Sequence, residues 1–200
     1  MMELRDRIIE EATKQFFQFG IRNITMDDIA ISLGISKRTV YDIFKNKSEL
    51  VQTCIKKLTT DHDLHISKVI SDSSNAIEAI FIFMREGIKA LNSINPVFFK
   101  DMEKLYPVLW HSIENESHNK RSELSAKLIQ KGIKDGLFRD DLKIEIVSKL
   151  FQEQINLLTD DKVFPRDKYN HSEVFQNMII NFTRGISTTK GIGVIDSILQ

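Results

Sequence analysis

The residues of this sequence whose types and spacing suggest chemistry are basic and lie between positions 37 and 47. Lys37, Arg38, Lys45 and Lys47 share that stretch with one acid, Asp42. Ammonium and guanidinium groups bind phosphate oxygens, and arginine also pairs with O6 and N7 of guanine in the major groove. The stretch therefore indicates nucleic-acid contact, although 28 basic and 28 acidic residues leave the whole chain without net charge. The alternative is a helical corner whose charges are only solvated.

Short helices are predicted on both sides of this basic stretch. Residues 3–19 carry apolar side chains at three- and four-residue spacing, the period of a helix, and Gly20 suits its end. Thr25 can cap a second helix, in whose first turn two aspartates complement the helix dipole. Ser36 can cap a third helix and Ser48 a fourth.

The second and third helices have the arrangement of a helix-turn-helix. Gly34 permits the tight reversal between them, and Ile35 fills the angle that they make. Val40 and Phe44 are four residues apart and form an inward face of the third helix. The remaining side chains of that helix then point outward or to the flanks, as a major-groove reader requires.

The run from Ile24 to Leu50 resembles the N-terminal signature of TetR-family transcriptional regulators, T-x-x-x-I-A-x-x-x-G-V-S-x-x-x-[LV]-Y-x-x-F-x-x-K-x-x-L. Eleven positions agree with that pattern: Thr25, Ile29, Ala30, Gly34, Ile35, Ser36, Val40, Tyr41, Phe44, Lys47 and Leu50. The resemblance covers about the first quarter of the chain and implies a DNA-reading head on a helical body. Ile43 and Asp42 depart from it, the first where an aromatic residue is frequent.

The resemblance implies roles for individual side chains. Tyr41 and Lys47 would contact phosphate or sugar, and Thr25 would present the N-terminus of the second helix to the DNA backbone. Arg38 is our preferred contact to guanine, whereas Asp42 either accepts a hydrogen bond from a cytosine amino group or repels phosphate. The expected DNA-binding residues are Thr25, Ser36, Lys37, Arg38, Thr39, Tyr41, Asp42, Lys45 and Lys47.

The rest of the chain also reads as helical. Helices are expected at about 75–93, 96–105, 107–135, 142–158 and 172–187, and no segment alternates in the manner of a strand. The tail 188–200 is either a short helix docked on the body or a disordered end. The predicted fold is therefore all-α, with a three-helix helix-turn-helix DNA-binding domain at 1–48 and a larger helical effector-binding and dimerisation domain at 49–200.

One short helix-turn-helix covers few base pairs, so a two-fold dimer on a pseudopalindrome is expected. The last two long helices carry broad apolar faces, which either pack within the monomer or form the dimer. The resemblance favours the dimer, with an interface of Phe151, Ile155, Leu158, Val174, Phe175, Met178, Ile179 and Phe182.

The middle helices are rich in bulky apolar residues. By periodicity these are core residues, yet clustered Phe and Met side chains also suit an apolar ligand pocket. The resemblance implies a small-molecule effector there, held by Phe81, Met84, Phe98, Phe99, Met102, Tyr106 and Trp110.

Other classes of function find little support. His62 with His65, and His111 with Glu114 and His118, have spacings that a divalent ion accepts, but no cysteine cluster or H-E-x-x-H pattern accompanies them. No G-x-S-x-G or P-loop is present, and Cys54 is expected to be an inert core thiol. We therefore expect no metal, no cofactor, no catalytic residue and no enzyme.

The resulting prediction is a cytoplasmic, sequence-specific DNA-binding repressor. It would bind a pseudopalindromic operator as a homodimer and be released by an effector of unknown identity, without contact to a membrane. The alternative is a DNA-binding architectural or cell-division factor that acts through protein partners and has no small-molecule effector.

Overall fold

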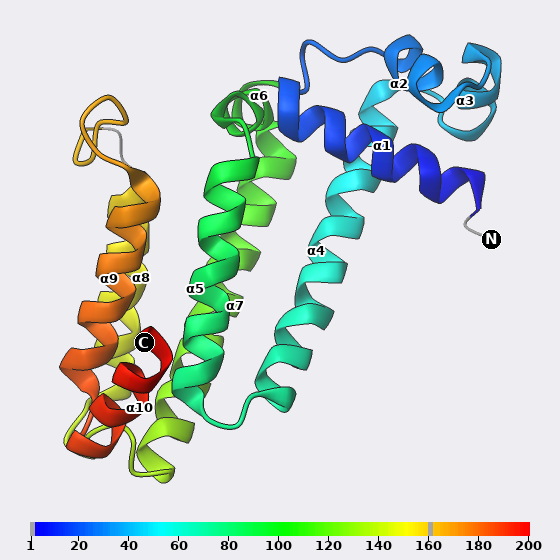
Figure 1. The fold of residues 1–200 in the computed structure, drawn as a ribbon. Coiled ribbons are helices and arrows are strands. Elements are labelled where there is room, and N and C mark those ends of the chain that lie inside the picture. The colour runs from blue at the N-terminus through cyan, green and yellow to red at the C-terminus, as the bar shows by residue number, and fades with distance from the viewer. Residues whose placement is uncertain (1–2, 160–161) are drawn as a thin grey trace. The chain divides into compact units, whose positions relative to one another are not determined.

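The structure of the chain, a computed structural model, describes residues 3–159 and 162–200, apart from the side chains of residues 117, 118 and 159. Within these ranges the chain forms helices and no strand, which confirms the all-α prediction (Figure 1). The helices are α1 (Leu4–Phe19), α2 (Met26–Leu33), α3 (Lys37–Ile43), α4 (Lys47–Asp72), α5 (Ala76–Ser93), α6 (Pro96–Leu105), α7 (Pro107–Lys134), α8 (Ile144–Thr159), α9 (His171–Ile186) and α10 (Thr189–Leu199). None of these helices is long and apolar enough to cross a membrane.

The start of α4 corrects one sequence prediction. Asn46 caps this helix instead of Ser48, because its Oδ1 accepts a hydrogen bond from the Glu49 N–H at 2.9 Å. The Glu49 carboxylate accepts in turn from the Lys45 N–H, also at 2.9 Å. The helix then continues to Asp72, well beyond the apolar residues that predicted it.

The helices pack into two compact units that interleave along the chain. Unit 1 comprises residues 1–66 and 93–113, and unit 2 comprises residues 67–92 and 114–200. The predicted domain boundary at residue 48 falls in the first turn of α4. A division of function between 1–48 and 49–200 stays a prediction.

The core of unit 1 fixes the geometry of its first three helices. Phe16 of α1, Ile29 of α2 and Val40 of α3 are buried together with Phe44 and Leu50, the latter in α4. Each of these short helices would be only marginally stable in isolation, so the burial of their apolar faces supplies most of their stability.

The end of α1 is fastened to α6. The Asn95 N–H donates to the Phe17 carbonyl at 2.8 Å, and the Arg22 N–H donates to the Asp101 carboxylate at 2.7 Å. Gly20 lies so close to α6 that a Cβ atom there would be 2.7 Å from Cγ1 of Val97. The two helices are therefore joined by hydrogen bonds and by contact of the Gly20 backbone with the Val97 side chain.

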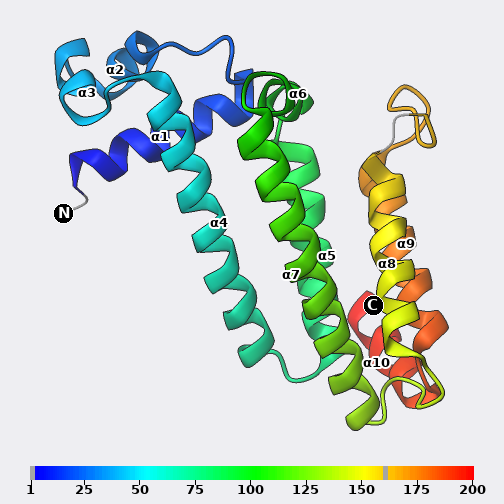
Figure 2. The same ribbon diagram turned by 180° about the vertical axis from the view of Figure 1, so that it is seen from behind.

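Unit 2 includes α8, α9 and α10, and the last of these helices is formed by the tail 188–200. Figures 1 and 2 both show α8 and α9 side by side. Residues 189–199 form a helix capped by Thr188, whose Oγ1 accepts from the Gly191 N–H at 3.2 Å. Ile195 of α10 is fully buried and an ion pair joins Arg184 of α9 to Asp196, so the tail is docked and ordered.

We predict that Gly20→Ala destabilises the protein more than Gly34→Ala. Both glycines have positive φ, +82° and +66°, but a Cβ at Gly34 meets nothing within 4 Å. Gly34 has a left-handed conformation that costs another residue about 1 kcal/mol, whereas Gly20 combines a conformation reserved for glycine with the clash at Val97. Urea unfolding of both variants measures this difference, and equal losses would contradict the close packing of α1 on α6.

We also predict that Cys54 is unreactive in the folded protein. Burial raises the pKa of its thiol to about 11, so roughly one thiol in a thousand is ionised at pH 8. Labelling with a disulfide reagent at pH 8 should proceed only after unfolding in urea. Labelling of the native protein at the rate of a free thiol would show that the α1–α4 contact opens readily.

Candidate nucleic-acid interface

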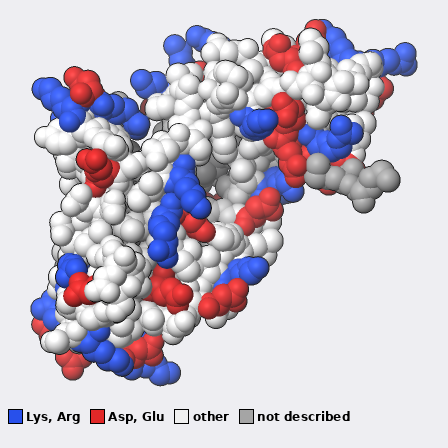
Figure 3. All heavy atoms as spheres, viewed as in Figure 1, with Lys and Arg blue, Asp and Glu red and all other residues white. Residues whose placement is uncertain are grey.

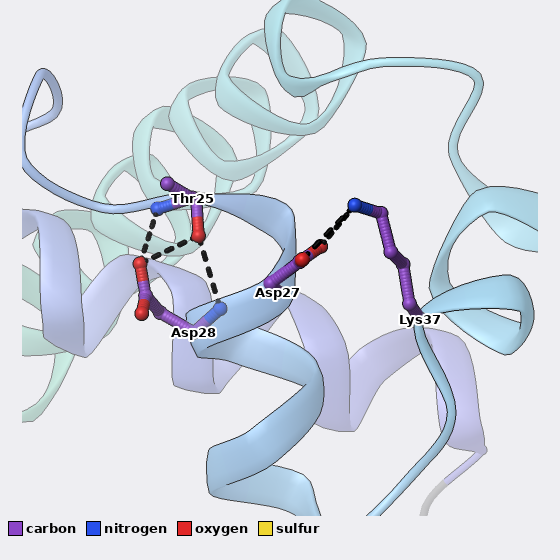
Figure 4. A network of polar contacts seen from close by, with 4 residues as sticks. All are labelled: Thr25, Asp27, Asp28 and Lys37. Carbon is purple, nitrogen blue, oxygen red and sulfur yellow. Dashed lines mark hydrogen bonds and ion pairs between the residues drawn. The ribbon is translucent and has the colours of Figure 1, made fainter.

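The N-terminus of α2 is held by a reciprocal pair of hydrogen bonds. Thr25 Oγ1 accepts from the Asp28 N–H at 3.2 Å, and the Asp28 carboxylate accepts from the Thr25 N–H at 2.8 Å (Figure 4). The hydrogen bonds that the Asp28 carboxylate accepts from the Thr25 hydroxyl and from the Thr25 N–H lower the pKa of Asp28. Thr25 thus has a structural role, as predicted, and the end of α2 that it caps is exposed.

The turn between α2 and α3 has the predicted conformation. Gly34 is left-handed, and the next N–H, that of Ile35, donates to the Ala30 carbonyl at 3.0 Å. Ser36 caps α3, since its Oγ accepts from the Thr39 N–H at 3.1 Å and lies 2.8 Å from the Thr39 hydroxyl. Ser36 and Thr39 therefore use part of their hydrogen-bonding capacity to hold the helix.

Arg38 is an outer residue of α3 whose side chain has no partner within the described residues. Its side chain is exposed, and it makes no hydrogen bond or ion pair with another described residue. Tyr41, one turn further along, is 43% exposed. A guanidinium group free of internal partners is able to form two hydrogen bonds to one guanine.

Lys37 is tied to α2 in a way that the sequence did not reveal. Its Nζ lies 2.9 Å from the Asp27 carboxylate (Figure 4) and 5.8 Å from the centre of the Tyr41 ring. The hydrogen bond and the charge of Asp27 raise the pKa of Lys37. In DNA binding, Asp27 would compete with a phosphate for this ammonium group. An aspartate ten residues before a lysine was too weak a signal to predict the pair.

The two lysines that follow α3 differ in their surroundings. Lys45 is exposed, whereas Lys47 is half-buried with its Nζ 3.4 Å from the Arg22 carbonyl. Burial lowers the pKa of Lys47, and the charges of Asp101 and Asp28 oppose that shift. Lys47 thus has structural neighbours in addition to its predicted DNA contact.

Asp42 is exposed at the end of α3, four residues after Arg38. No ion pair joins these two side chains in the described structure, so the carboxylate is available to an external donor. Figure 3 shows basic and acidic side chains interspersed over the face that it presents, in agreement with the zero net charge. The DNA contacts of all nine residues stay a prediction.

The predicted dimer residues lie on the adjacent helices α8 and α9. Leu158 and Ile179 are buried within unit 2, and the Phe151 and Phe182 rings pack together with centres 4.9 Å apart. The other four are half-buried: Ile155, Val174, Phe175 and Met178. Their role in a dimer stays a prediction.

The opposite face of α8 carries apolar residues that the core does not cover. Ile146, Leu150 and Leu157 are 54%, 54% and 47% exposed, and the helical period places them on one side. The dimer residues expected from the sequence did not include Ile146 and Leu157, because periodicity alone does not tell which of two apolar faces the core takes.

The predicted effector residues divide between the two units. Phe81 and Met84 are buried in the core of unit 2, whereas Phe98 and Met102 are buried in that of unit 1. The remaining three lie in unit 1 and are exposed or half-buried: Phe99, Tyr106 and Trp110. A pocket formed by this set stays a prediction.

The histidine sets show no metal site in the part of the chain that the structure describes. Within it, no three His, Cys, Asp or Glu side chains come together as ligands. The side chain of His118, a member of one of those sets, lies outside the described residues.

Comparison with known proteins places the helix-turn-helix in a family. Residues 8–54 match the family model described as bacterial regulatory proteins, tetR family. The chain is 24% identical over 152 residues to the HTH-type transcriptional repressor KstR2 of Rhodococcus jostii, covering 74% of each protein. It is 43% identical over 65 residues to the HTH-type transcriptional regulator SAUSA300_2515 of Staphylococcus aureus, covering 32% of this chain and 34% of that one.

Solved structures share the fold of nearly the whole chain. A transcriptional regulator from Saccharomonospora viridis, solved in complex with choline, superposes with a TM-score of 0.69 at 18% identity. The match covers 92% of this chain and 97% of that one.

We predict that Asp27→Asn strengthens binding to DNA. The change frees the Lys37 ammonium and removes one negative charge beside it, so affinity should rise several-fold at low salt and the salt dependence should steepen by up to about one unit. Stability should hardly change, because the pair is exposed. Band-shift titrations at several salt concentrations measure this.

The matched control is Asp61→Asn, which removes an exposed carboxylate paired with Lys57 on α4. It changes net charge equally but leaves Lys37 paired. An equal gain in both variants would mean that Asp27 acts only through net charge.

Proposed function

We propose that this chain, whose residues 8–54 match the model of the tetR family of bacterial regulatory proteins, is a transcriptional repressor acting in the cytoplasm. It binds a pseudopalindromic operator as a homodimer and leaves it when a small molecule binds the helical body. The observation that carries the proposal is the capped, Gly34-linked pair α2–α3 with the unpaired Arg38 on its outer side.

DNA reading is assigned to α3. Its seven residues begin at a capped N-terminus, and Arg38 is the second of them. A recognition helix contacts base edges with its N-terminal residues, so Arg38 meets guanine while Tyr41 and Lys45 meet the backbone. Lys37 joins the contact when phosphate replaces Asp27 as its partner.

Dimerisation is assigned to α8 and α9. A helix as short as α3 reads few base pairs, so two copies spaced about 34 Å apart are needed for a useful site. The exposed stripe Ile146, Leu150 and Leu157 supports this, since an apolar stripe on a helix whose other face is already in a core suits burial by a partner.

Control by a small molecule is the third part of the proposal. The structurally similar regulator from Saccharomonospora viridis holds choline, and this supports a ligand site in a body of the same fold. A ligand releases DNA only if it binds the released state more tightly than the DNA-bound state.

The test of DNA reading is selection of bound sequences from a random duplex pool at low salt. We expect enrichment of two inverted half-sites, and failure to enrich any sequence contradicts the proposed function. On the selected site, Arg38→Ala should relax the preference at one base pair of each half-site, where a bidentate contact is worth about 1–3 kcal/mol. Lys45→Ala is the matched control, because loss of a phosphate contact weakens all sequences alike.

The test of dimerisation is Leu150→Glu. A carboxylate in an apolar helix interface is costly to bury, so sedimentation should show monomers and operator affinity should fall at least tenfold. Leu64→Glu is the control, because Leu64 of α4 is 67% exposed and lies outside α8 and α9. A dimer that survives Leu150→Glu would place the interface elsewhere.

A further inference from the structure

Two buried polar side chains on α8 have oxygen atoms without a hydrogen-bond partner. Ser148 is 3% exposed and Gln152 is 1% exposed. Within the described structure, Oγ of Ser148 and Oε1 of Gln152 neither accept nor donate a hydrogen bond. The residues are four apart, so both side chains lie on one face of the helix.

Other buried hydroxyl groups of unit 2 are paired in the usual way. Thr183 of α9 donates to the Ile179 carbonyl at 2.7 Å, and Ser73 donates to the Val69 carbonyl at 2.6 Å. Leaving a buried polar atom unpaired costs free energy, and proteins pair nearly all such atoms. Ser148 and Gln152 therefore call for a partner from outside the chain.

The surroundings limit the chemistry of that partner. The neighbouring inward residues of α8 are apolar, and Val147, Phe151 and Ile155 all pack against the core of unit 2. The charged residues of this part of α8 face solvent, where Lys149 and Glu153 form an exposed ion pair. An ionised ligand would find no opposite charge on the inner face of α8, and burial of an unpaired charge is costly.

We propose that Ser148 and Gln152 hydrogen-bond the polar group of the effector, an uncharged and largely apolar molecule with a hydroxyl or amide N–H group. The donor of the ligand pairs with Gln152 Oε1, and the Ser148 hydroxyl accepts from or donates to the same group. This inference rests on the proposed function, since it names the chemistry of the small molecule that releases DNA.

A ligand can reach the Ser148 and Gln152 oxygens only if the conformation of the protein changes. Both oxygens are closed off from solvent, so a ligand reaches them only after neighbouring side chains or helices move. A ligand that satisfies them therefore stabilises a conformation other than the closed one, which is the requirement for control of the DNA-binding surface.

The first experiment measures the stability of the ligand-free protein. Gln152→Leu and Ser148→Ala remove polar atoms that lack a partner, so both variants should melt at the same temperature as the wild type or higher. Thr183→Val is the matched control, because it removes a paired buried hydroxyl and should lower the melting temperature. A lower melting temperature in both α8 variants would mean that a structural water pairs these atoms, and would overturn the proposal.

The second experiment uses cyclohexanol and methylcyclohexane, two probes of similar shape that differ in a hydroxyl group. Calorimetric titration should show that the wild type binds cyclohexanol about tenfold more tightly, and that Gln152→Leu removes this preference. Equal affinity of the wild type for both probes, an unchanged preference in the variant, or no binding of cyclohexanol overturns the proposal. Choline serves as the charged probe, and binding of choline that depends on Gln152 overturns the assignment of an uncharged ligand.

A third measurement separates this inference from the function on which it rests. Without probe, the Ser148→Ala and Gln152→Leu variants should bind the selected operator as the wild type does, because neither residue belongs to the DNA-binding head. If the wild type binds no operator, the proposed function fails. If DNA binding is intact but the probe preference does not depend on Gln152, only the present inference fails.

Discussion

The attachment of α1 to α6 is the constraint on which unit 1 depends. At Gly20 the backbone of α1 ends against Val97, and hydrogen bonds from Asn95 and Arg22 close the joint on both sides. The rings of Phe17 and Phe98 meet beside it, 4.8 Å apart and edge to face. The helix α1 also shares one apolar core with α2 and α3. Its attachment to α6 therefore joins a helix from the middle of the chain to the DNA-binding head.

This joint has consequences for regulation. A displacement of α6 either moves the end of α1 with it or breaks the hydrogen bonds that Asn95 and Arg22 make across the joint. The helices of the head share one apolar core, and capping groups hold the starts of α2, α3 and α4. Movement of α6 would therefore move the helices of the head together. The surface that contains Arg38 would keep its shape.

The helix α8 combines two surfaces with different tasks. One face is packed within unit 2 and contains Ser148 and Gln152, while the opposite face exposes Ile146, Leu150 and Leu157. A helix that is apolar on both sides is normally buried on both sides. Ligand binding on one face and subunit contact on the other would thus involve the same helix. A small shift of α8 on ligand binding would then also move the surface that contacts the other subunit.

The sequence by itself determined the helices and the helix-turn-helix. Gly20 and Gly34 were each expected to end a helix, and both have positive φ at helix ends because other residues are strained there. Apolar spacing located α1, α5, α6, α7, α8 and α9 to within a few residues, because the helical period is a local property of the chain.

Only the tertiary structure decided which groups meet. The pairing of Lys37 with Asp27, the division of Phe81 and Phe98 between two cores, and the docking of α10 by Ile195 depend on packing between distant residues. The unpaired oxygens of Ser148 and Gln152 belong to the same class, since a serine and a glutamine in a helix look solvent-facing until burial is known. Local spacing fixes the conformation of a segment, whereas the burial of a polar atom and the choice of its partner are fixed by everything that packs around it.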